Sequence, residues 1–462
     1  MSIYKITKFL FASFLLLVLP QLVWAQDVDS KPFAPFISSD RILIVSPHPD
    51  DEAIATGGVI SRAVKAGIPL KIVYLTNGDN NEPAFMIYEK RLVVKQKAVL
   101  MMGELRCHES INGMQALGVK RDQLVFLGYP DWGTEDIFKA FWSERKPFKT
   151  GLTRVNHVPY EDALSAGSPY VGDSILKDFK QVLTEFKPTK IFVSNQLDSQ
   201  RDHRAAFLFL QVALWDLEES IPRPDVYGYV VHSAYKWPTP RGYHPDQELT
   251  PPKNMSDENM TWYSSPLSAD DILRKRQAVT FYRTQIACNP PYLFTFVKLN
   301  ELFTKVPDID LTKVKEAVLK SGEALTFSKD DQFVYMKLNS DYWPELSTKI
   351  QIYLFGYSKK IAFEVMPKIR LDIGKDDNKV LVYEKDRSIF VPEAIVNMDN
   401  KGKILTIKFP LKELQDPDYL LISGMVCSQA VNLSSIKPGL DLITKICLAY
   451  IMIGVGLKFI ID

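Results

Sequence analysis

The sequence has little cysteine and no excess of charge of either sign. Its four cysteines show no C-x-x-C spacing, which argues against a thiolate zinc site, and they are too few to form a disulfide scaffold. A disulfide between Cys107 and Cys288 stays open. The 56 basic residues nearly equal the 55 acidic ones, so no global field attracts nucleic acid or acidic lipid. A chain of 462 residues with this composition is typical of a soluble globular protein with two folded domains.

The first residues differ from the rest. Lys5 and Lys8 precede an apolar run at 9–19, and a small residue, Ala25, closes the segment. This pattern predicts a secretory signal peptide at 1–25, with cleavage after Ala25. No cysteine lies near that point, which argues against a lipoprotein anchor. We therefore expect a secreted or periplasmic protein.

The last residues form an apolar tail at 437–462. Its run at 446–457 carries no charge and is bounded by Lys445 and Lys458. A spanning helix needs about 20 apolar residues, so the run is too short. We expect a buried terminal strand or helix, with a weak membrane association as the less favoured alternative.

The chain divides near residue 305. Before it, apolar strands alternate with helical patterns, which predicts an α/β fold with a mostly parallel sheet and helices on both faces. Strands are expected at 41–46, 70–76, 123–127 and 190–194, and helices at 52–66, 106–117, 174–186 and around 207–215. Polar loops follow these strands, and ligand sites of open α/β sheets lie at that carboxyl edge.

Residues 306–436 have short alternating apolar runs separated by Asp, Asn, Gly and Lys turns. This pattern predicts an antiparallel β-sandwich that serves as an accessory domain, binding glycan or packing on the first domain. Tyr342, Trp343 or Tyr357 could form an exposed platform for a sugar, although aromatic residues in strands more often belong to the core.

The most informative motif is Pro47-His48-Pro49-Asp50-Asp51-Glu52, which follows the apolar run at 42–45. A buried strand that ends in an imidazole and adjacent carboxylates brings costly ionisable groups to one point, and a divalent cation compensates them. The alternative is a hydrated turn in which Asp50 or Asp51 caps the following helix.

The chain has six histidines, and two of them fall in loops expected at the same sheet edge. His48 and His203 each lie near aspartates, and two imidazoles with one carboxylate make a catalytic zinc site with an open position for water. We predict His48, Asp51 and His203 as the ligands, with Asp50 free to act as a base. The remaining histidines are interpreted as solvated (His108, His157 and His244) or as a core or rim residue with a substrate contact as the alternative (His232).

Together, the motifs S-P-H-P-D-D-E at 46–52 and D-H-R-A at 202–205 resemble the zinc-dependent PIG-L/LmbE-type N-acetylglucosamine deacetylases. The resemblance covers roughly residues 38–305. Further matching elements occur in the same order: T-N-G-D at 76–79, R-C-H-E at 106–109, A-L-G-V at 116–119, F-L-G-Y-P-D at 126–131 and a segment at 275–285 that ends in Thr-Gln.

This resemblance implies a Rossmann-like fold and removal of acetyl groups, or cleavage of related amides, from amino-sugar conjugates. His48, Asp51 and His203 match the zinc ligands, although another divalent metal stays open, and Asp50 matches the general base. By the same resemblance, the residues that hold the sugar, phosphate or inositol portion of the substrate are Arg106 and Asp131.

One position departs from the family pattern. Many relatives have a histidine that stabilises the oxyanion three residues before the second ligand histidine, and this chain has Gln200 there. A glutamine amide can donate a hydrogen bond but supplies no charge or proton. Either Gln200 acts as the weaker donor or another group such as His232 takes over. Asp202 is expected to orient His203 or the Asp50 carboxyl.

We therefore expect a zinc-dependent hydrolase that removes N-acetyl groups from an amino-sugar or glycan substrate by metal-activated water. Two alternatives stay open: a metal-dependent amidase for a sugar–amino-acid conjugate, and a non-catalytic secreted glycan-binding protein. Acetate release from N-acetylated saccharides separates them.

Overall fold

The computed structural model describes residues 30–90, 95–233, 237–255 and 260–305. In the C-terminal part it describes 309–310, 317–319, 325–339, 348–374, 380–384, 387–398, 404–428 and 453–458. The predicted signal peptide, Tyr342 and Trp343 lie outside the described residues, as does most of the predicted tail. Among the helices that the structure describes, none is long and apolar enough to cross a bilayer.

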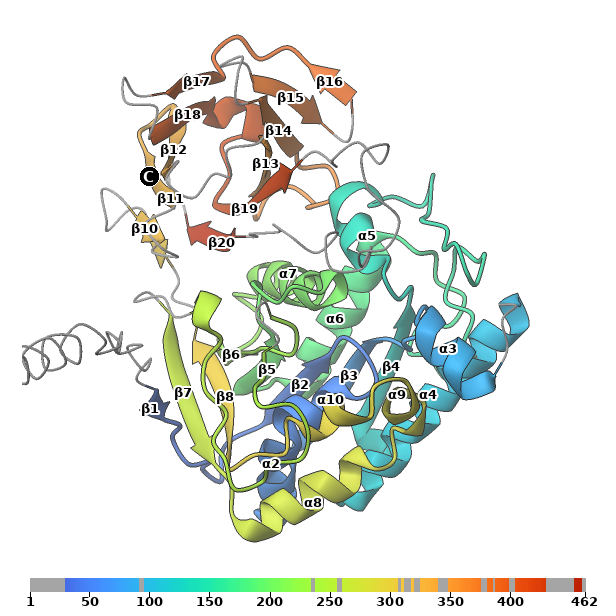
Figure 1. Ribbon diagram of the computed structural model, residues 1–462. Coiled ribbons are helices and arrows are strands. Elements are labelled where there is room, and N and C mark those ends of the chain that lie inside the picture. The colour runs from blue at the N-terminus through green and yellow to red at the C-terminus, as the bar shows by residue number, and fades with distance from the viewer. Residues whose placement is uncertain are drawn as a thin grey trace, which may run out of the picture.

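The first part of the chain is built on an eight-stranded sheet in the order β1-β7-β8-β6-β5-β2-β3-β4 (Figure 1). The five strands β6, β5, β2, β3 and β4 run parallel, and β8 runs antiparallel to β6 and β7. The strand bounds are β1 Lys31–Pro32, β2 Ile42–Ser46, β3 Leu70–Thr76, β4 Leu124–Tyr129, β5 Lys190–Ser194, β6 Asp225–Tyr229, β7 Thr261–Pro266 and β8 Asn300–Lys305.

Helices cover both faces of this sheet, as alternate side chains of its central strand show. Ile42 and Ile44 of β2 join one apolar core with α2, α4 and α8, whereas Leu43 and Val45 join a second core with α5, α6 and α7. A strand that is buried on both faces needs such a continuous apolar run. The helix bounds are α2 Asp51–Lys65, α3 Glu82–Glu89, α4 Gln96–Ala116, α5 Thr134–Ala140, α6 Gly172–Phe186, α7 Arg201–Asp216, α8 Ala269–Val279, α9 Arg283–Cys288 and α10 Pro290–Phe294.

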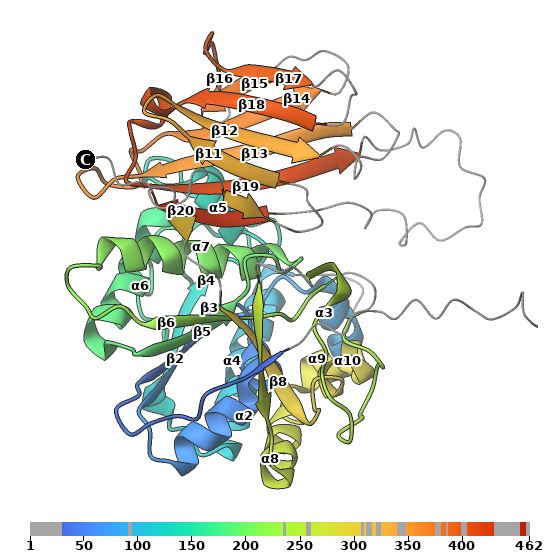
Figure 2. The same ribbon diagram turned by 90° about the vertical axis from the view of Figure 1, so that its left-hand side faces the viewer.

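The C-terminal part consists of two β-sheets that share one apolar core (Figure 2). The sheet orders are β10-β11-β12-β18-β17 and β16-β15-β14-β13-β19-β20-β9, and the pairings are antiparallel apart from β20 with β9. The bounds are β9 Ile309–Asp310, β10 Ala317–Leu319, β11 Leu325–Lys329, β12 Phe333–Asn339, β13 Thr348–Tyr357, β14 Lys368–Gly374, β15 Val380–Glu384, β16 Arg387–Ile389, β17 Ile395–Met398, β18 Ile404–Pro410, β19 Tyr419–Ser428 and β20 Ile453–Lys458.

The sandwich packs on helices α5 and α7 of the first part (Figures 1 and 2). The Tyr419 ring stacks on Trp215 of α7 at a centroid distance of 4.6 Å, and the Phe355 ring stacks on Phe138 of α5 at 5.7 Å. Tyr357 is buried in this contact and its hydroxyl donates to Asp216 at 2.9 Å. The alternative role of Tyr357 in an exposed sugar platform is therefore wrong, because its ring lies inside an apolar contact.

The predicted fold class is confirmed: a mostly parallel α/β sheet is followed by antiparallel sheets. One helix boundary differs from expectation. Helix α4 begins at Gln96 rather than near residue 106. Its N-cap, Lys95, makes no side-chain capping hydrogen bond, so no residue at this point marks the start of a helix. The disulfide that the sequence left open between Cys107 and Cys288 is not formed, since both are free thiols. In the tail, β20 pairs with β19, which agrees with a terminal strand.

Candidate metal centre

Two loops at the carboxyl edge of the sheet bring together His48, Asp51 and His203, which we call the candidate metal centre. Strands β2 and β5 are parallel neighbours, so the loops that follow them meet. Asp51 Oδ2 lies 3.2 Å from His48 Nδ1 and 3.1 Å from His203 Nε2. All three side chains are buried. The sequence predicted this grouping correctly as a juxtaposition.

The donor atoms fit a divalent metal. Nε2 of His203 is a buried nitrogen with no hydrogen-bond partner, and it faces the Asp51 carboxylate. Such an orphaned atom is costly unless a ligand satisfies it. Two imidazole nitrogens and one carboxylate oxygen form the set found in catalytic zinc sites that keep an open position.

The far nitrogen of His48 is held by two carboxylates. Its Nε2 lies 3.2 Å from Asp131 Oδ1 and 3.3 Å from Asp202 Oδ2. A carboxylate that accepts the Nε2 proton fixes the tautomer in which Nδ1 carries the lone pair. Asp131 was predicted to hold the substrate, and the structure places it, buried, behind the His48 ring.

The sequence led us to expect that Asp202 orients His203 or the Asp50 carboxyl. In the structure it orients neither of them. Its carboxylate contacts His48 and accepts hydrogen bonds from the backbone N–H groups of Trp132 at 2.7 Å and Thr134 at 3.1 Å. The reason is the helical direction of α7, which sends the side chains of adjacent residues to different neighbours. Asp202 faces β4 and α5, while His203 faces Asp51.

The groups that orient His203 were missed. Its Nδ1 lies 2.8 Å from Ser194 Oγ and 3.3 Å from Asp198 Oδ2. Burial alone would lower the pKa of His203, but the charges of Asp198 and Asp51 outweigh it and raise the pKa to about 9. A signal was present, because Ser194 ends the strand and Asp198 opens the polar loop that follows.

Gln200 acts as the N-cap of α7. Its Oε1 accepts the backbone N–H groups of Asp202 and His203, at 2.5 Å and 3.1 Å. Its Nε2 lies 3.1 Å from Asp202 Oδ2 and 3.3 Å from His48 Nε2. Both ends of the amide therefore have partners within the protein, which differs from the expected donor to an oxyanion.

Asp50 stands beside the candidate metal centre in a strained backbone conformation. Its φ is 125°, a region that residues other than glycine rarely adopt. The backbone N–H donates to Glu52 Oε2 at 3.0 Å, and Glu52 is in turn bound by the hydroxyls of Tyr74 and Tyr282. These hydrogen bonds thus stabilise the strained backbone conformation that orients the Asp50 carboxyl.

The pKa values of the two adjacent aspartates are shifted in opposite directions. Burial, and then the negative charge of Asp51, raise the pKa of Asp50 well above its usual range. Burial would raise the pKa of Asp51 as well, but His203 outweighs it and holds this pKa well below the usual range. Neighbouring carboxyls whose pKa values separate in this way are suited to different roles.

Arg106 is hydrogen-bonded to backbone carbonyls of the loops that follow β2 and β3. Its Nη1 donates to the Gly78 carbonyl at 2.7 Å and its Nη2 to the Pro49 carbonyl at 2.8 Å, while Nη2 also lies 3.6 Å from Asp50 Oδ2. A Cβ at Gly78 would lie 2.1 Å from Nη1, so this close approach requires glycine. The predicted substrate contact of Arg106 stays a prediction, and its buried position makes it a support for the Asp50 loop.

His232 also lies at the candidate metal centre, just beyond β6. Its ring is 4.8 Å from that of His203, centroid to centroid. Burial lowers the pKa of His232 to about 4, so its imidazole is neutral near pH 7. His108 and His157 are exposed and His244 is half-exposed, as expected of solvated histidines.

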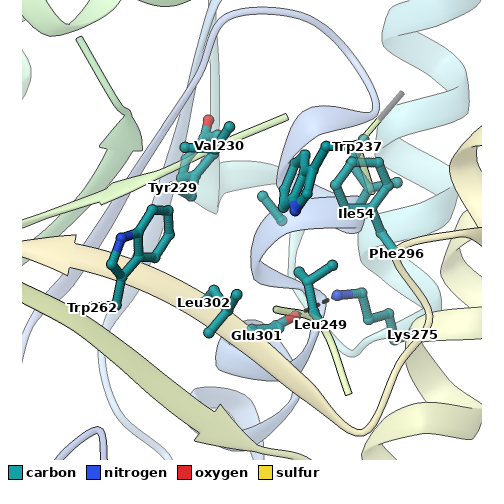
Figure 3. Close-up of a pocket in the computed structure, with 11 residues that line it drawn as sticks. Ile54, Tyr229, Val230, Trp237, Leu249, Trp262, Lys275, Phe296, Glu301 and Leu302 are labelled. Carbon is teal, nitrogen blue, oxygen red and sulfur yellow. Dashed lines mark hydrogen bonds and ion pairs between the residues drawn. The ribbon is translucent and has the colours of Figure 1, made fainter. Parts of the chain in front are cut away.

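A separate recess lies between α2, β6 and β8 (Figure 3). Trp237, Trp262 and Phe296 form its apolar walls, and the buried pair of Lys275 Nζ and Glu301 Oε1, 2.7 Å apart, lies at one side. Glu301 also accepts the backbone N–H groups of residues 58 and 59 in α2. These contacts anchor α2 to β8, and none of the lining residues belongs to the candidate metal centre.

Part of the chain is similar to known proteins. Residues 43–214 match the PIG-L family model, described as GlcNAc-PI de-N-acetylase. A 1D-myo-inositol 2-acetamido-2-deoxy-alpha-D-glucopyranoside deacetylase of Mycobacterium sp. (strain KMS) is 28% identical over 181 residues, 38% of this chain and 52% of that protein. The enzyme of the same name from Corynebacterium glutamicum (strain R) is 32% identical over 84 residues, 18% of this chain and 28% of that protein. The chain thus spans about half the length, or less, of these curated relatives.

Solved structures of deacetylases are also similar to part of the chain. The A40926 pseudoaglycone deacetylase Dbv21 has 18% identity and a TM-score of 0.36, covering 58% of this chain and 96% of that one. The N,N'-diacetylchitobiose deacetylase from Pyrococcus horikoshii has 18% identity and a TM-score of 0.32, covering 53% and 70%.

Proposed function

We propose that this chain, whose residues 43–214 match the PIG-L family model, is a zinc-dependent N-deacetylase acting on an amino-sugar-containing glycan or glycoconjugate. The observation that carries the proposal is the buried group of His48, Asp51 and His203 with the strained Asp50 beside it. The curated relatives, named for deacetylation of a 2-acetamido-2-deoxy-glucopyranoside, support the substrate class.

His48 Nδ1, Asp51 Oδ2 and His203 Nε2 are the atoms that would hold the cation. When bound, a zinc ion would lower the pKa of its water and polarise the carbonyl of the substrate amide. Contacts within the protein determine which nitrogen of each imidazole is available to the cation. Asp202 accepts the Nε2 proton of His48, with the Asp131 carboxylate 3.2 Å from the same nitrogen, and Ser194 and Asp198 face Nδ1 of His203. Each ring can thus present a lone pair to the same point.

Asp50 carries the proton in this mechanism. Its carboxylate accepts a proton from the attacking water and then gives it to the amide nitrogen, which leaves as an amine while acetate is formed. Its raised pKa favours the protonated form that the second step needs. Arg106 and Glu52 hold the loop so that the carboxyl stays in place.

The test combines metal analysis with acetate release. The purified chain should bind about one zinc per molecule and release acetate from at least one of a panel of N-acetylated saccharides. Hydrolysis of a sugar–amino-acid amide without acetate release would favour the amidase alternative instead. Glycan binding with neither activity would contradict the proposal.

A further inference from the structure

His232 is fixed beside the candidate metal centre by its backbone and its ring. Its backbone N–H donates to Asp198 Oδ2 at 2.9 Å, the carboxylate that also faces His203. Its imidazole lies at 69° to that of His203, with the centroids 4.8 Å apart. The backbone of His232 and the ring of His203 thus share the Asp198 carboxylate, which places the two imidazoles side by side.

The hydrogen bonds of Tyr292 determine which nitrogen of His232 carries the proton. The Tyr292 hydroxyl oxygen lies 2.9 Å from the carbonyl of Val231 and 3.0 Å from His232 Nδ1. A carbonyl can only accept, and a phenol has a single proton, so the hydroxyl donates to Val231 and accepts from Nδ1–H. The neutral imidazole then has its lone pair on Nε2. The Arg241 guanidinium over the Tyr292 ring, at 4.7 Å, helps to keep the phenol in place.

Nε2 of His232 has no protein partner among the described residues. The side chain is half-buried. Because Nε2 has no partner and yet is not one of the fully buried polar atoms, solvent or a ligand can reach it. Gln200, the residue expected to contact the reacting group, is instead occupied at both ends of its amide. His232 thus offers an accessible acceptor next to His203.

We infer that His232 recognises the substrate by accepting, at Nε2, a hydrogen bond from a hydroxyl of the amino-sugar ring. This inference rests on the proposed function. An amino sugar whose acetamide lies at the candidate metal centre carries hydroxyls on its ring, and these are donors that Nε2 of the adjacent His232 can accept. The residue therefore acts in substrate recognition and does not stabilise an oxyanion, because that role needs a proton on Nε2.

The test uses the zinc-loaded full chain with methyl N-acetylglucosaminide and its 3-, 4- and 6-monodeoxy analogues. The wild-type chain should lose about tenfold in kcat/KM on one analogue, mainly through KM, as expected for one hydrogen bond. His232→Phe keeps a flat ring without an acceptor, so it should lose about tenfold on the parent sugar and treat that analogue and the parent equally. His232→Gln, which retains an acceptor, should recover part of the discrimination.

Exposed His157→Phe serves as the matched control and should behave as wild type on all four sugars. An equal loss on every substrate in His232→Phe would overturn the inference, since a structural role or a contact with the acetamide N–H would give that result. So would a wild-type chain that treats all four sugars alike.

Two further measurements keep the inference separate from the proposed function. If the wild-type chain releases no acetate from any sugar, the deacetylase proposal fails, and calorimetric binding of the corresponding methyl glucosaminides then tests the hydroxyl contact with the same variants. ¹⁵N shifts of the imidazoles, assigned by difference against His232→Gln, should show a proton on Nδ1 and none on Nε2. A protonated Nε2 would overturn the inference whatever the activity.

Discussion

Replacement of Asp198 by asparagine removes the buried charge that orients a predicted metal ligand. The carboxylate lies 3.3 Å from His203 Nδ1, and its Oδ2 accepts the backbone N–H groups of Val231 at 2.8 Å and His232 at 2.9 Å. Asparagine has nearly the same shape but replaces one acceptor oxygen by a donor. The other oxygen, Oδ1, accepts the backbone N–H of Gln200 at 3.0 Å. Asp198→Asn therefore removes the charge beside His203 and, whichever way the amide is placed, leaves at least one backbone donor without its acceptor.

Both metal affinity and stability should fall. Loss of the carboxylate behind a ligating histidine typically weakens metal binding by about 10–100-fold. A buried donor left without an acceptor costs about 1–3 kcal/mol. We expect the Kd for zinc of Asp198→Asn to rise by about 10–100-fold, and the free energy of unfolding of the metal-free chain to fall by about 1–3 kcal/mol.

Competition with a chromophoric chelator measures the zinc Kd, and urea unfolding measures stability. Asp216→Asn is the matched control, because Asp216 ends the same helix α7 and contacts Tyr357 and Lys180 at its other end. This control should keep the wild-type zinc affinity. A zinc affinity of Asp198→Asn that equals wild type, with stability reduced, would refute the reasoning, since the carboxylate would then serve only the fold.

Three other substitutions and one processing event give independent tests. Asp50→Asn should keep its zinc and lose about 10²–10⁴-fold in kcat, measured by acetate release, and unchanged turnover would remove Asp50 from the mechanism. Trp215→Ala, which removes the ring stacked on Tyr419, should lower the free energy of unfolding by about 3–5 kcal/mol, and an unaltered thermal transition would contradict the contact. Burial would raise the pKa of Glu135, but one lysine and two arginines outweigh it and lower the pKa to about 2. The stabilisation from this carboxylate is thus present above its ordinary pKa of about 4.3 and lost as the pH falls toward about 2, so Glu135→Gln should destabilise the chain more at pH 7 than in acid, as urea unfolding at both pH values can check. Mass spectrometry of the exported protein should find a mature chain that begins directly after Ala25, and an intact N-terminus would contradict the predicted signal peptide.

The sequence predicted much of the first sheet because its central strands are buried on both faces. Such strands read as short continuous apolar runs, and the predicted bounds of β3 and β5 match the structure. The strands β1, β7 and β8 were not predicted, since they lie on the other side of the parallel block and their order in the sheet does not follow the chain. Their pairing is a long-range property.

For the candidate metal centre, the sequence identified the residue types and the structure assigned their neighbours. His48, Asp51 and His203 follow strands that end at one edge, and this rule of topology sufficed to bring them together. The partner of each imidazole could not be predicted in the same way. Asp202 is adjacent to His203 in sequence, yet it contacts His48 because the helix rotates adjacent side chains apart.

The sequence by itself determined the fold class, the predicted ligands and the position of Asp50, since apolar periodicity and the order of polar loops are local properties. Only the tertiary structure decided that Gln200 caps a helix, that Asp198 and Ser194 orient His203, and that the Tyr292 hydroxyl lies within hydrogen-bond distance of His232 Nδ1. These contacts join segments far apart in the chain or depend on where a side chain points, and hydrogen-bond direction is set by atoms in space rather than by residue order.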